Sequence, residues 1–418
     1  MQPRSTRRAL LPLAAAAVTL AALPAAHAEF AITGLGSARA GEVTLSGMNP
    51  AAAKDNSLAG GNFVLFLSGS KNAGGGYSGG FSCSTVATTA DGAMAGWSAN
   101  TVPVTHTWSN AFTGQENFAG NNTGGGFGSY GNTVGDSNGP FCNDEARVYL
   151  ATPFGTFAAG NMINPLRNLY DNATVDPYYG NEYVYYQTSD YRANGLRYGN
   201  SWGDFAIDVQ LNLYSGNAPA HSPRKGEVLT ALATYDFGPV QVGYGFGGGN
   251  SAAPGSKYTD VGAGLTYKGT QGVYVRTSLG PVGIGATVFN GKVGANTFTG
   301  APTSIARNMT DYRLKLTYAS GKWSYVGIAG VMTEKGDFTG DAAFGNPMYT
   351  FVNSGISAPR IKITRDDLDL FAMYDLGSGL KPYLRYNILS KKYSTPDNAA
   401  ASAKGTAQTI EGGVQVSF

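Results

Sequence analysis

Residues 409–418, the last ten of the chain, alternate strictly between two kinds of side chain. Apolar residues and glycine occupy the even positions, whereas Glu411 and Gln415 occupy odd ones. Because successive side chains of a β-strand point to opposite faces, this segment has one apolar and one polar surface. About ten residues is also the length of a tilted strand that crosses a bilayer. The pattern predicts a membrane-spanning strand with Ile410 and Val416 toward lipid and with Glu411 and Gln415 lining water.

The same alternation recurs upstream. Three further segments show it: 205–214, 312–318 and 384–388. In the second and third segments, the polar positions at mid-strand include Arg313, Lys315 and Arg385. The buried face of a soluble β-sandwich rarely holds such residues, whereas the water-filled lumen of a barrel accepts them. Alternation therefore makes these three residues, and Arg197, candidates for the lining of a pore.

Composition also favours a barrel. The chain has 60 glycines, 25 tyrosines and 20 phenylalanines, and only 13% of its residues are charged, against about 25% in an average soluble domain. Barrels use tyrosine at the membrane interfaces and glycine in curved strands and turns. A secreted glycine-rich adhesin or β-solenoid could share this composition, but the sequence has no fixed-period repeat to support a solenoid. We therefore expect an all-β, transmembrane antiparallel β-barrel.

The first residues predict export. Three arginines within the first eight residues precede an apolar run at 9–24, and Ala26-His27-Ala28 fits a cleavage site. This is the three-part layout of a secretory signal peptide, although a membrane anchor is the alternative. We expect a signal peptide at 1–28, a barrel domain at 29–418 and a location in the bacterial outer membrane.

Charge and histidine content exclude two kinds of partner. Without the three arginines of the signal segment, the 29 basic residues fall to 26, against 27 acidic residues. This near-neutral balance is not the basic footprint of a nucleic-acid-binding protein. His106 and His221 are the only histidines beyond the signal segment, and neither lies in a cluster with metal-ligand spacing. We expect no nucleic-acid partner, metal or cofactor.

The chain has two cysteines, Cys83 and Cys142, both in segments rich in Gly, Ser and Asn. An exported protein meets an oxidising compartment. A disulfide that clamps a loop is therefore the simplest interpretation, although the sequence alone does not establish that these two cysteines pair with each other.

Turn signals and alternation together suggest the strand count. From residue 145 onward we expect thirteen strands: 145–152, 155–162, 183–198, 204–214, 227–236, 240–247, 258–268, 272–290, 309–318, 323–332, 366–375, 381–391 and 409–418. Three candidates precede them: 30–46, 62–68 and 102–109. Short connections are expected at 236–239, 319–322 and 375–379, and long ones near 215–227, 248–257, 291–308, 334–364 and 392–407. Sixteen strands is the favoured total, with fourteen or eighteen left open. Short turns on one rim and long loops on the other are typical of outer-membrane barrels.

Residues 145–214 resemble the core segment of the Gram-negative general porins. The matching strings are ARVYLA at 146–151, FGTFAAGN at 154–161, NP at 164–165, DPY at 176–178, DYRAN at 190–194 and YGNS at 198–201. The terminal strand resembles the closing strand of outer-membrane barrels, whose last aromatic residue is an assembly signal. This resemblance gives that role to Phe418 and implies outer-membrane lipid and the barrel-assembly machinery as partners.

The resemblance implies a passive channel for small hydrophilic solutes and ions, assembled as a homotrimer. Its third loop, here residues 164–182, would fold into the barrel and narrow the pore. Acidic residues of this loop would face a wall of basic residues, and the resulting field would influence which solutes pass. The implied constriction residues are Arg147, Arg192, Asp171, Asp176 and Glu182.

Two alternative functions remain open on the sequence. The long loops could serve adhesion, or the tyrosines of the loop region could form a path for sugars in a solute-selective channel. These tyrosines are Tyr170, Tyr178, Tyr179, Tyr183, Tyr185 and Tyr186. Gly76, Ser78 and Gly80 fit the G-x-S-x-G string of hydrolases, but that string needs a strand-to-helix elbow and acid and histidine partners. In a chain with 60 glycines the string is expected by chance, and we expect no enzyme.

Overall fold

The fold was analysed in a computed structural model of the chain. It describes residues 28–47, 56–90, 142, 145–163, 165–174, 192–213, 227–250, 264–296, 304–337, 360–395 and 398–418. The statements below concern these residues.

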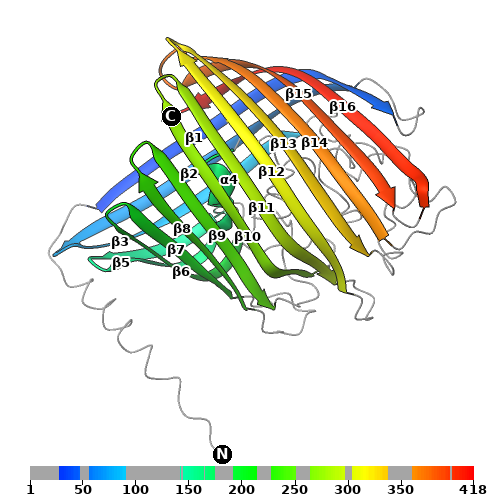
Figure 1. Ribbon diagram of the computed structural model, residues 1–418. Helices are drawn as coiled ribbons and strands as arrows, with labels where there is room; N and C mark the ends of the chain where they lie inside the picture. Colours follow the sequence, from blue (N-terminus) through cyan, green and yellow to red (C-terminus); the bar gives the residue numbers. More distant parts are fainter. Residues whose placement is uncertain are drawn as a thin grey trace, which may run out of the picture.

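The described residues form one closed antiparallel β-barrel of sixteen strands (Figure 1). Each strand pairs with its neighbours in sequence, and β1 pairs with β16 to close the sheet. The strands are β1 Ala28–Gly47, β2 Asn56–Gly74, β3 Tyr77–Ala90, β4 Glu145–Thr152, β5 Gly155–Ile163, β6 Arg192–Trp202, β7 Phe205–Leu213, β8 Glu227–Phe237, β9 Val240–Asn250, β10 Gly264–Leu279, β11 Val282–Asn296, β12 Ser304–Ser320, β13 Trp323–Asp337, β14 Arg360–Tyr374, β15 Leu380–Thr395 and β16 Asn398–Ser417. The predicted fold class and the favoured strand count are confirmed.

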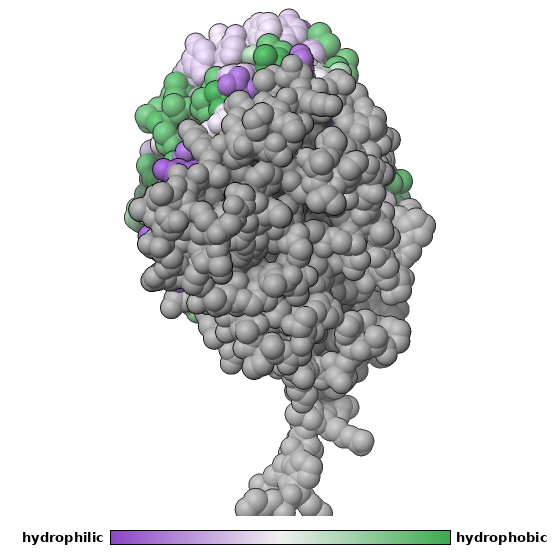
Figure 2. Space-filling view, turned by 90° about the vertical axis from the view of Figure 1, so that its right-hand side faces the viewer, coloured by the Kyte–Doolittle hydropathy of each residue, from purple (hydrophilic) through white to green (hydrophobic). Residues whose placement is uncertain are grey.

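Strand β12 shows how alternation divides the wall into two faces. Tyr312 and Leu316 are 55% and 49% exposed, whereas Asp311 and Arg313 are 1% and 6% exposed. The large apolar residues therefore point out of the barrel, and the charged ones point into it. Figure 2 shows hydrophobic residues in green beside pale, weakly polar ones on the coloured part of the outer surface. An apolar outer band is what a lipid environment requires.

Tight turns join pairs of strands at one rim of the barrel. They lie at 75–76, 153–154, 203–204, 238–239, 280–281, 321–322 and 375–379. Gly280 and Gly321 adopt φ of 60° and 59°, a conformation that glycine accepts without steric cost. The carboxyl end of the chain lies at the same rim, where Phe418 and Gly34 exchange two backbone hydrogen bonds of 2.9 and 3.1 Å.

Several predicted boundaries were wrong. The strand between β2 and β4 is Tyr77–Ala90, whereas the candidate at 102–109 lies outside the described residues. The predicted strands 258–268 and 272–290 are instead β10 and β11, because the register shift between Lys268 and Gln271 is an irregularity within β10 and the turn comes at 280–281. The long loop expected near 392–407 is mostly strand, since β15 and β16 pair as far as Thr395 and Asn398.

Helix is scarce in the described part of the chain. One 3₁₀ turn, Pro165–Arg167, leads into a short α-helix, α4, at Asn168–Asp171. No helix among the described residues is long and apolar enough to cross a membrane.

Candidate functional site: the interior of the barrel

The segment 165–174 lies inside the barrel, between β5 and β6 in sequence. Figure 1 shows α4 within the ring of strands. Leu166 and Leu169 are fully buried and Ala173 is nearly so. They form one apolar cluster with side chains from the inner wall: Leu232, Tyr274, Phe289 and Met332. The described part of the predicted loop therefore packs against one side of the lumen, and we call the inner faces of β8–β11 the loop bed.

Glycines make room for the segment on this bed. A Cβ atom added at Gly245 would come within 2.8 Å of the side chains of Leu166 and Leu169, and one at Gly272 would come within 2.8 Å of Leu169. A Cβ at Gly285 would overlap the carbonyl oxygen of Ala173. At Gly245 and Gly272 a larger residue would have to displace the two leucine side chains, whereas at Gly285 it would meet the backbone of the loop, so Gly285 is the position that lets the loop backbone lie against the wall.

Hydrogen bonds fix the same segment. The hydroxyl of Thr287 on β11 donates to the carbonyl oxygen of Leu169 at 3.0 Å, and it lies 3.0 Å from the hydroxyl of Thr174. Asn172 donates to the hydroxyl of Tyr274 at 3.0 Å, and that hydroxyl donates to Gln241 at 2.7 Å. Buried polar groups that find partners make the docked position specific.

A band of charged residues lines the inner wall from β12 to β1. At its centre, Arg385 Nε donates to Asp369 Oδ1 at 2.8 Å, and Arg385 Nη1 lies 3.5 Å from Glu411 Oε1. Arg39 of β1 lies 3.5 Å from the other oxygen of Glu411. The guanidinium of Arg385 also sits 5.2 Å from the ring centre of Phe371. These contacts join four strands across the seam where the barrel closes.

The band continues to β12. Arg313 Nε donates to Asp311 Oδ2 at 3.1 Å, and Arg313 Nη1 lies 3.6 Å from Asp367 Oδ2. Asn387 donates to Asp367 at 2.9 Å and to Asp369 at 2.8 Å, which connects the two halves. We call this set the charged wall: Arg39, Asp311, Arg313, Asp367, Asp369, Arg385, Asn387 and Glu411. Asp369 and Glu411 are 0% and 1% exposed, so their charges are balanced by partners rather than by water.

Two other predicted pore residues lie on the inward face of shorter strands. Arg147 of β4 donates to the hydroxyl of Ser82 at 2.7 Å and lies 3.6 Å from Glu145. Arg197 of β6 donates to Asp208 at 2.7 Å. Lys315 of β12 is half-buried and shares the face of Arg313 by alternation.

The remaining predicted constriction residues are described only in part. Arg192 is the first residue of β6 and pairs with Ile163, and Asp171 is the last residue of α4. The side chains of these two residues lie outside the described part of the structure, as do Asp176 and Glu182 altogether. Of the tyrosines proposed for a sugar path, Tyr170 lies in α4 but its side chain is outside the described part, and the others lie outside it altogether.

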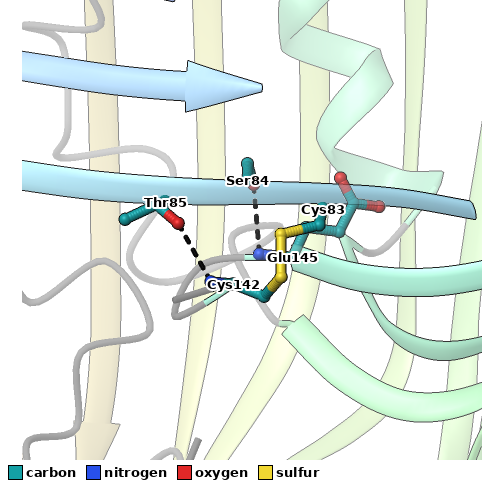
Figure 3. Close-up of a disulfide and its surroundings, with 5 residues drawn as sticks. All are labelled: Cys83, Ser84, Thr85, Cys142 and Glu145. Carbon is teal, nitrogen blue, oxygen red and sulfur yellow. Dashed lines mark hydrogen bonds between the residues drawn. A yellow bond between two sulfur atoms is a disulfide. The ribbon is translucent and has the colours of Figure 1, made fainter. Parts of the chain in front are cut away.

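Cys83 and Cys142 form a disulfide with a Cα–Cα distance of 5.1 Å (Figure 3). The backbone N–H of Cys142 donates to the hydroxyl of Thr85 at 2.9 Å, and that of Glu145 donates to Ser84 at 3.1 Å. The bond joins positions 59 residues apart, and it anchors the chain to β3 just before β4 begins pairing there.

One expectation about the terminal strand is wrong. Glu411 points inward as predicted, but it is buried against Arg39 and Arg385 instead of lining water. The sequence reasoning did not identify its partners because a single strand does not reveal its neighbours. Besides Glu411 itself, the alternation of Asp367 and Asp369 on β14 is a signal in the sequence for the acidic half of the charged wall.

Among the described residues, no group of three or more His, Cys, Asp or Glu is arranged to hold a metal ion. G-x-S-x-G falls on the turn before β3 and on β3 itself, and the described chain continues from it as strand to Ala90 instead of turning into a helix.

An antiparallel barrel with an apolar outer face, a charged inner face and a loop packed in its lumen has the architecture of an outer-membrane channel. The sequence matches the Gram-negative porin family over residues 14–392, and the chain therefore belongs to that family. It is an outer-membrane porin. None of the curated proteins compared with the chain matches it.

Solved structures of other proteins share the fold. An anion-selective porin from Comamonas acidovorans has a TM-score of 0.57 and 13% identity, with 93% of this chain and 100% of that chain covered. OmpT of Vibrio cholerae in a trimer form has a TM-score of 0.55 and 13% identity, with coverages of 93% and 99%. Salmonella typhi OmpF, in complex with daunomycin, has a TM-score of 0.53 and 13% identity, with coverages of 93% and 97%. At these identities the likeness concerns the fold alone.

Proposed function

We propose that this porin is a non-catalytic, passive diffusion channel for small hydrophilic solutes and ions. Its working form is a homotrimer in outer-membrane lipid. The segment 1–28 directs export and is cleaved, and Phe418 marks the chain for the barrel-assembly machinery. Family membership supports these features, and a trimer form is known for the Vibrio cholerae protein of the same fold.

The observation that carries the proposal is the position of 165–174 on the loop bed. Buried leucines and hydrogen bonds hold this segment against the inner wall, and a segment in that position would narrow the water column without closing it at a rim. An adhesin, by contrast, needs bulk outside the barrel rather than inside it. The comparisons favour neither the adhesin nor the sugar-selective alternative.

We further propose that charges around this segment set the field in the constriction. Arg147 and Arg192 would form its basic side, and Asp171, Asp176 and Glu182 its acidic side. Lys315 is a candidate lining residue, whereas Arg197, Arg313 and Arg385 act chiefly through their acidic partners. Rings of charge and pore width together determine which ions pass.

The test is conductance in a planar lipid bilayer. Addition of purified protein is expected to raise the current in steps, one for each channel that inserts. These channels should stay open at low applied voltage. Reversal potentials in a salt gradient for wild type and Arg147→Gln would show whether this arginine contributes to ion selection. A folded, heat-modifiable protein that gave no current steps would contradict the channel proposal.

A further inference from the structure

The outer surface of the barrel has a shallow hollow between β11 and β15. Its volume is about 570 Å³. The side chains around it are almost entirely apolar or aromatic, and they come from five adjacent strands. The outward-facing members that shape it are Leu316, Tyr318, Tyr325, Gly327, Leu370 and Ala372.

Two small residues create the hollow. Gly327 on β13 lies between Leu316 and Leu370 in the pairing of the sheet, and Ala372 lies beside Tyr325. Leu316, Tyr325 and Leu370 are more than 40% exposed and stand above the wall as ridges. A Cβ atom added at Gly327 would meet only Leu370, at an ordinary 3.5 Å. The backbone there does not require glycine, so the missing side chain leaves space on the surface rather than relieving a clash.

Aromatic rings border the hollow toward the tight-turn rim. The ring of Trp323 lies 4.9 Å from that of Tyr374 and 6.0 Å from that of Tyr325, and Tyr325 lies 6.3 Å from Tyr318. Tryptophan and tyrosine gather where lipid headgroups meet the acyl chains. The hollow therefore begins at the level of the headgroups and extends into the apolar layer.

A single cation stands at the headgroup end. Lys322 occupies the tight turn between β12 and β13, and its Nζ lies 5.9 Å from the ring centre of Tyr374. Among the tight turns that the structure describes, Lys322 is the one basic residue, whereas Asp204 and Asp375 are acidic. Among the tight turns described at this rim, the turn that holds Lys322 is therefore the one whose charge attracts an anionic headgroup.

We propose that this hollow binds one anionic phospholipid of the periplasmic leaflet. The phosphate lies at Lys322 between the polar edges of Trp323 and Tyr374. One acyl chain runs over Gly327 and Ala372 between the ridges of Leu316, Tyr325 and Leu370. Short turns of outer-membrane barrels face the periplasm, so the leaflet at this rim is the phospholipid one that faces that compartment. The site lies on the outer wall and does not depend on the constriction.

Native mass spectrometry of the purified porin tests this site. The probe is palmitoyl-oleoyl phosphatidylglycerol, added to protein stripped of lipid in detergent. Wild type is expected to retain one molecule per chain after detergent removes the others. Lys322→Gln is expected to lower the retained fraction about fivefold, the effect of one interfacial lysine worth about 1 kcal/mol. Gly327→Leu fills the hollow and is expected to abolish retention.

Two variants serve as matched controls. Lys381→Gln removes a lysine at the same rim that alternation places on the inward face, and Ala233→Leu adds a leucine to the outer face of β8. Both are expected to bind the lipid like wild type. Equal retention in wild type, Lys322→Gln and Gly327→Leu would mean unspecific surface lipid and would overturn the proposal. Loss in Ala233→Leu would overturn it as well.

Bilayer conductance distinguishes this inference from the channel proposal. Gly327→Leu and Lys322→Gln are expected to conduct like wild type, because neither side chain faces the lumen. Heat-modifiable migration on a gel would show that each variant is folded. Failure of the lipid site would leave the current steps intact, and failure of the channel would leave lipid retention intact.

Discussion

The loop bed and the charged wall are two parts of one barrel that follow the same alternation but hold different inward residues. On β9, β10 and β11 the inward positions that meet the loop include Gly245, Gly272 and Gly285, and a folded segment covers them. From β12 to β1 the inward positions include buried acids and arginines that pair across strands. Alternation determines which face of the barrel wall a side chain points to. Whether an inward position is glycine, apolar or charged depends instead on what lies against it in the lumen, the loop or the charged residues of neighbouring strands.

The two regions also differ in what stabilises them. The loop bed gains stability from apolar burial and a few hydrogen bonds, in the manner of a small protein core. The charged wall depends on every ion having its partner, because a buried charge without one is costly. Changes in the charged wall should therefore affect the stability of the whole barrel, and changes in the loop bed should affect mainly the loop.

The largest effect is expected from Asp369→Ala. It removes one of the two acidic partners of Arg385 and one of the two of Asn387 at a fully buried position. Because Glu411 still faces Arg385, the free energy of unfolding should fall by about 3 kcal/mol, the lower end of the cost of breaking a buried ion pair. Denaturant titration of the protein in lipid vesicles measures this. The matched control is Asp208→Ala, whose pair with Arg197 is 21% and 17% exposed, so that water can reach the arginine left behind and the loss should be smaller than for Asp369→Ala. Equal losses in the two variants would refute the special role of the charged wall.

Leu169→Ala tests the loop bed. Truncation of a fully buried leucine typically costs about 2–5 kcal/mol. Here this loss should weaken the docking of the loop on the inner wall rather than lower the stability of the strands. The expected result is faster proteolysis within the loop and larger current fluctuations, with little change in the denaturation midpoint of the barrel. A large fall in the denaturation midpoint, with proteolysis of the loop at the wild-type rate, would show that the loop bed and the charged wall do not differ in what they stabilise.

Gly285→Val should have a smaller effect of the same kind. Its side chain would overlap the carbonyl of Ala173 and displace the loop, at a cost of about 1–3 kcal/mol for overpacking. Conductance should rise as the loop leaves the wall. Gly199→Val on β6 is the control, because a Cβ there meets nothing closer than 3.8 Å. A rise in conductance of similar size in the control would point to a general loosening of the barrel.

The strong alternation of the later strands allowed most of the fold to be predicted. Strand β7, and β12 from Tyr312 to Tyr318, carry large apolar residues at every second position, and the sequence shows them directly. Strand β3 was missed because Ser, Gly and Thr fill most of its positions and give almost no contrast between its faces. The first half of β16 was read as loop for a similar reason, since alanines dominate it.

The interior could be predicted only as far as single strands permit. Alternation indicated that Arg313 and Arg385 point inward, but it did not show which acids they meet. Arg313 pairs with Asp311 of its own strand and with Asp367 two strands away, and Arg385 pairs with Asp369 and Glu411 of the two flanking strands. The roles of Leu166 and Leu169 could not be inferred, because apolar residues in a short loop look the same whether they face lipid or a wall. Gly285 gave no signal among 60 glycines, since its close contact with Ala173 exists only in the folded barrel.

The most direct test of the central claim is a cross-link between the loop and its bed. The hydroxyls of Thr174 and Thr287 lie 3.0 Å apart, so Thr174→Cys with Thr287→Cys places two thiols within bonding reach. Mild oxidation of the folded porin should join these residues, as mapped by mass spectrometry of the peptides, and should leave the single-channel conductance at the wild-type value. Failure to form the bond in folded protein, or a bond that changes the conductance severalfold, would contradict a loop that rests on this wall.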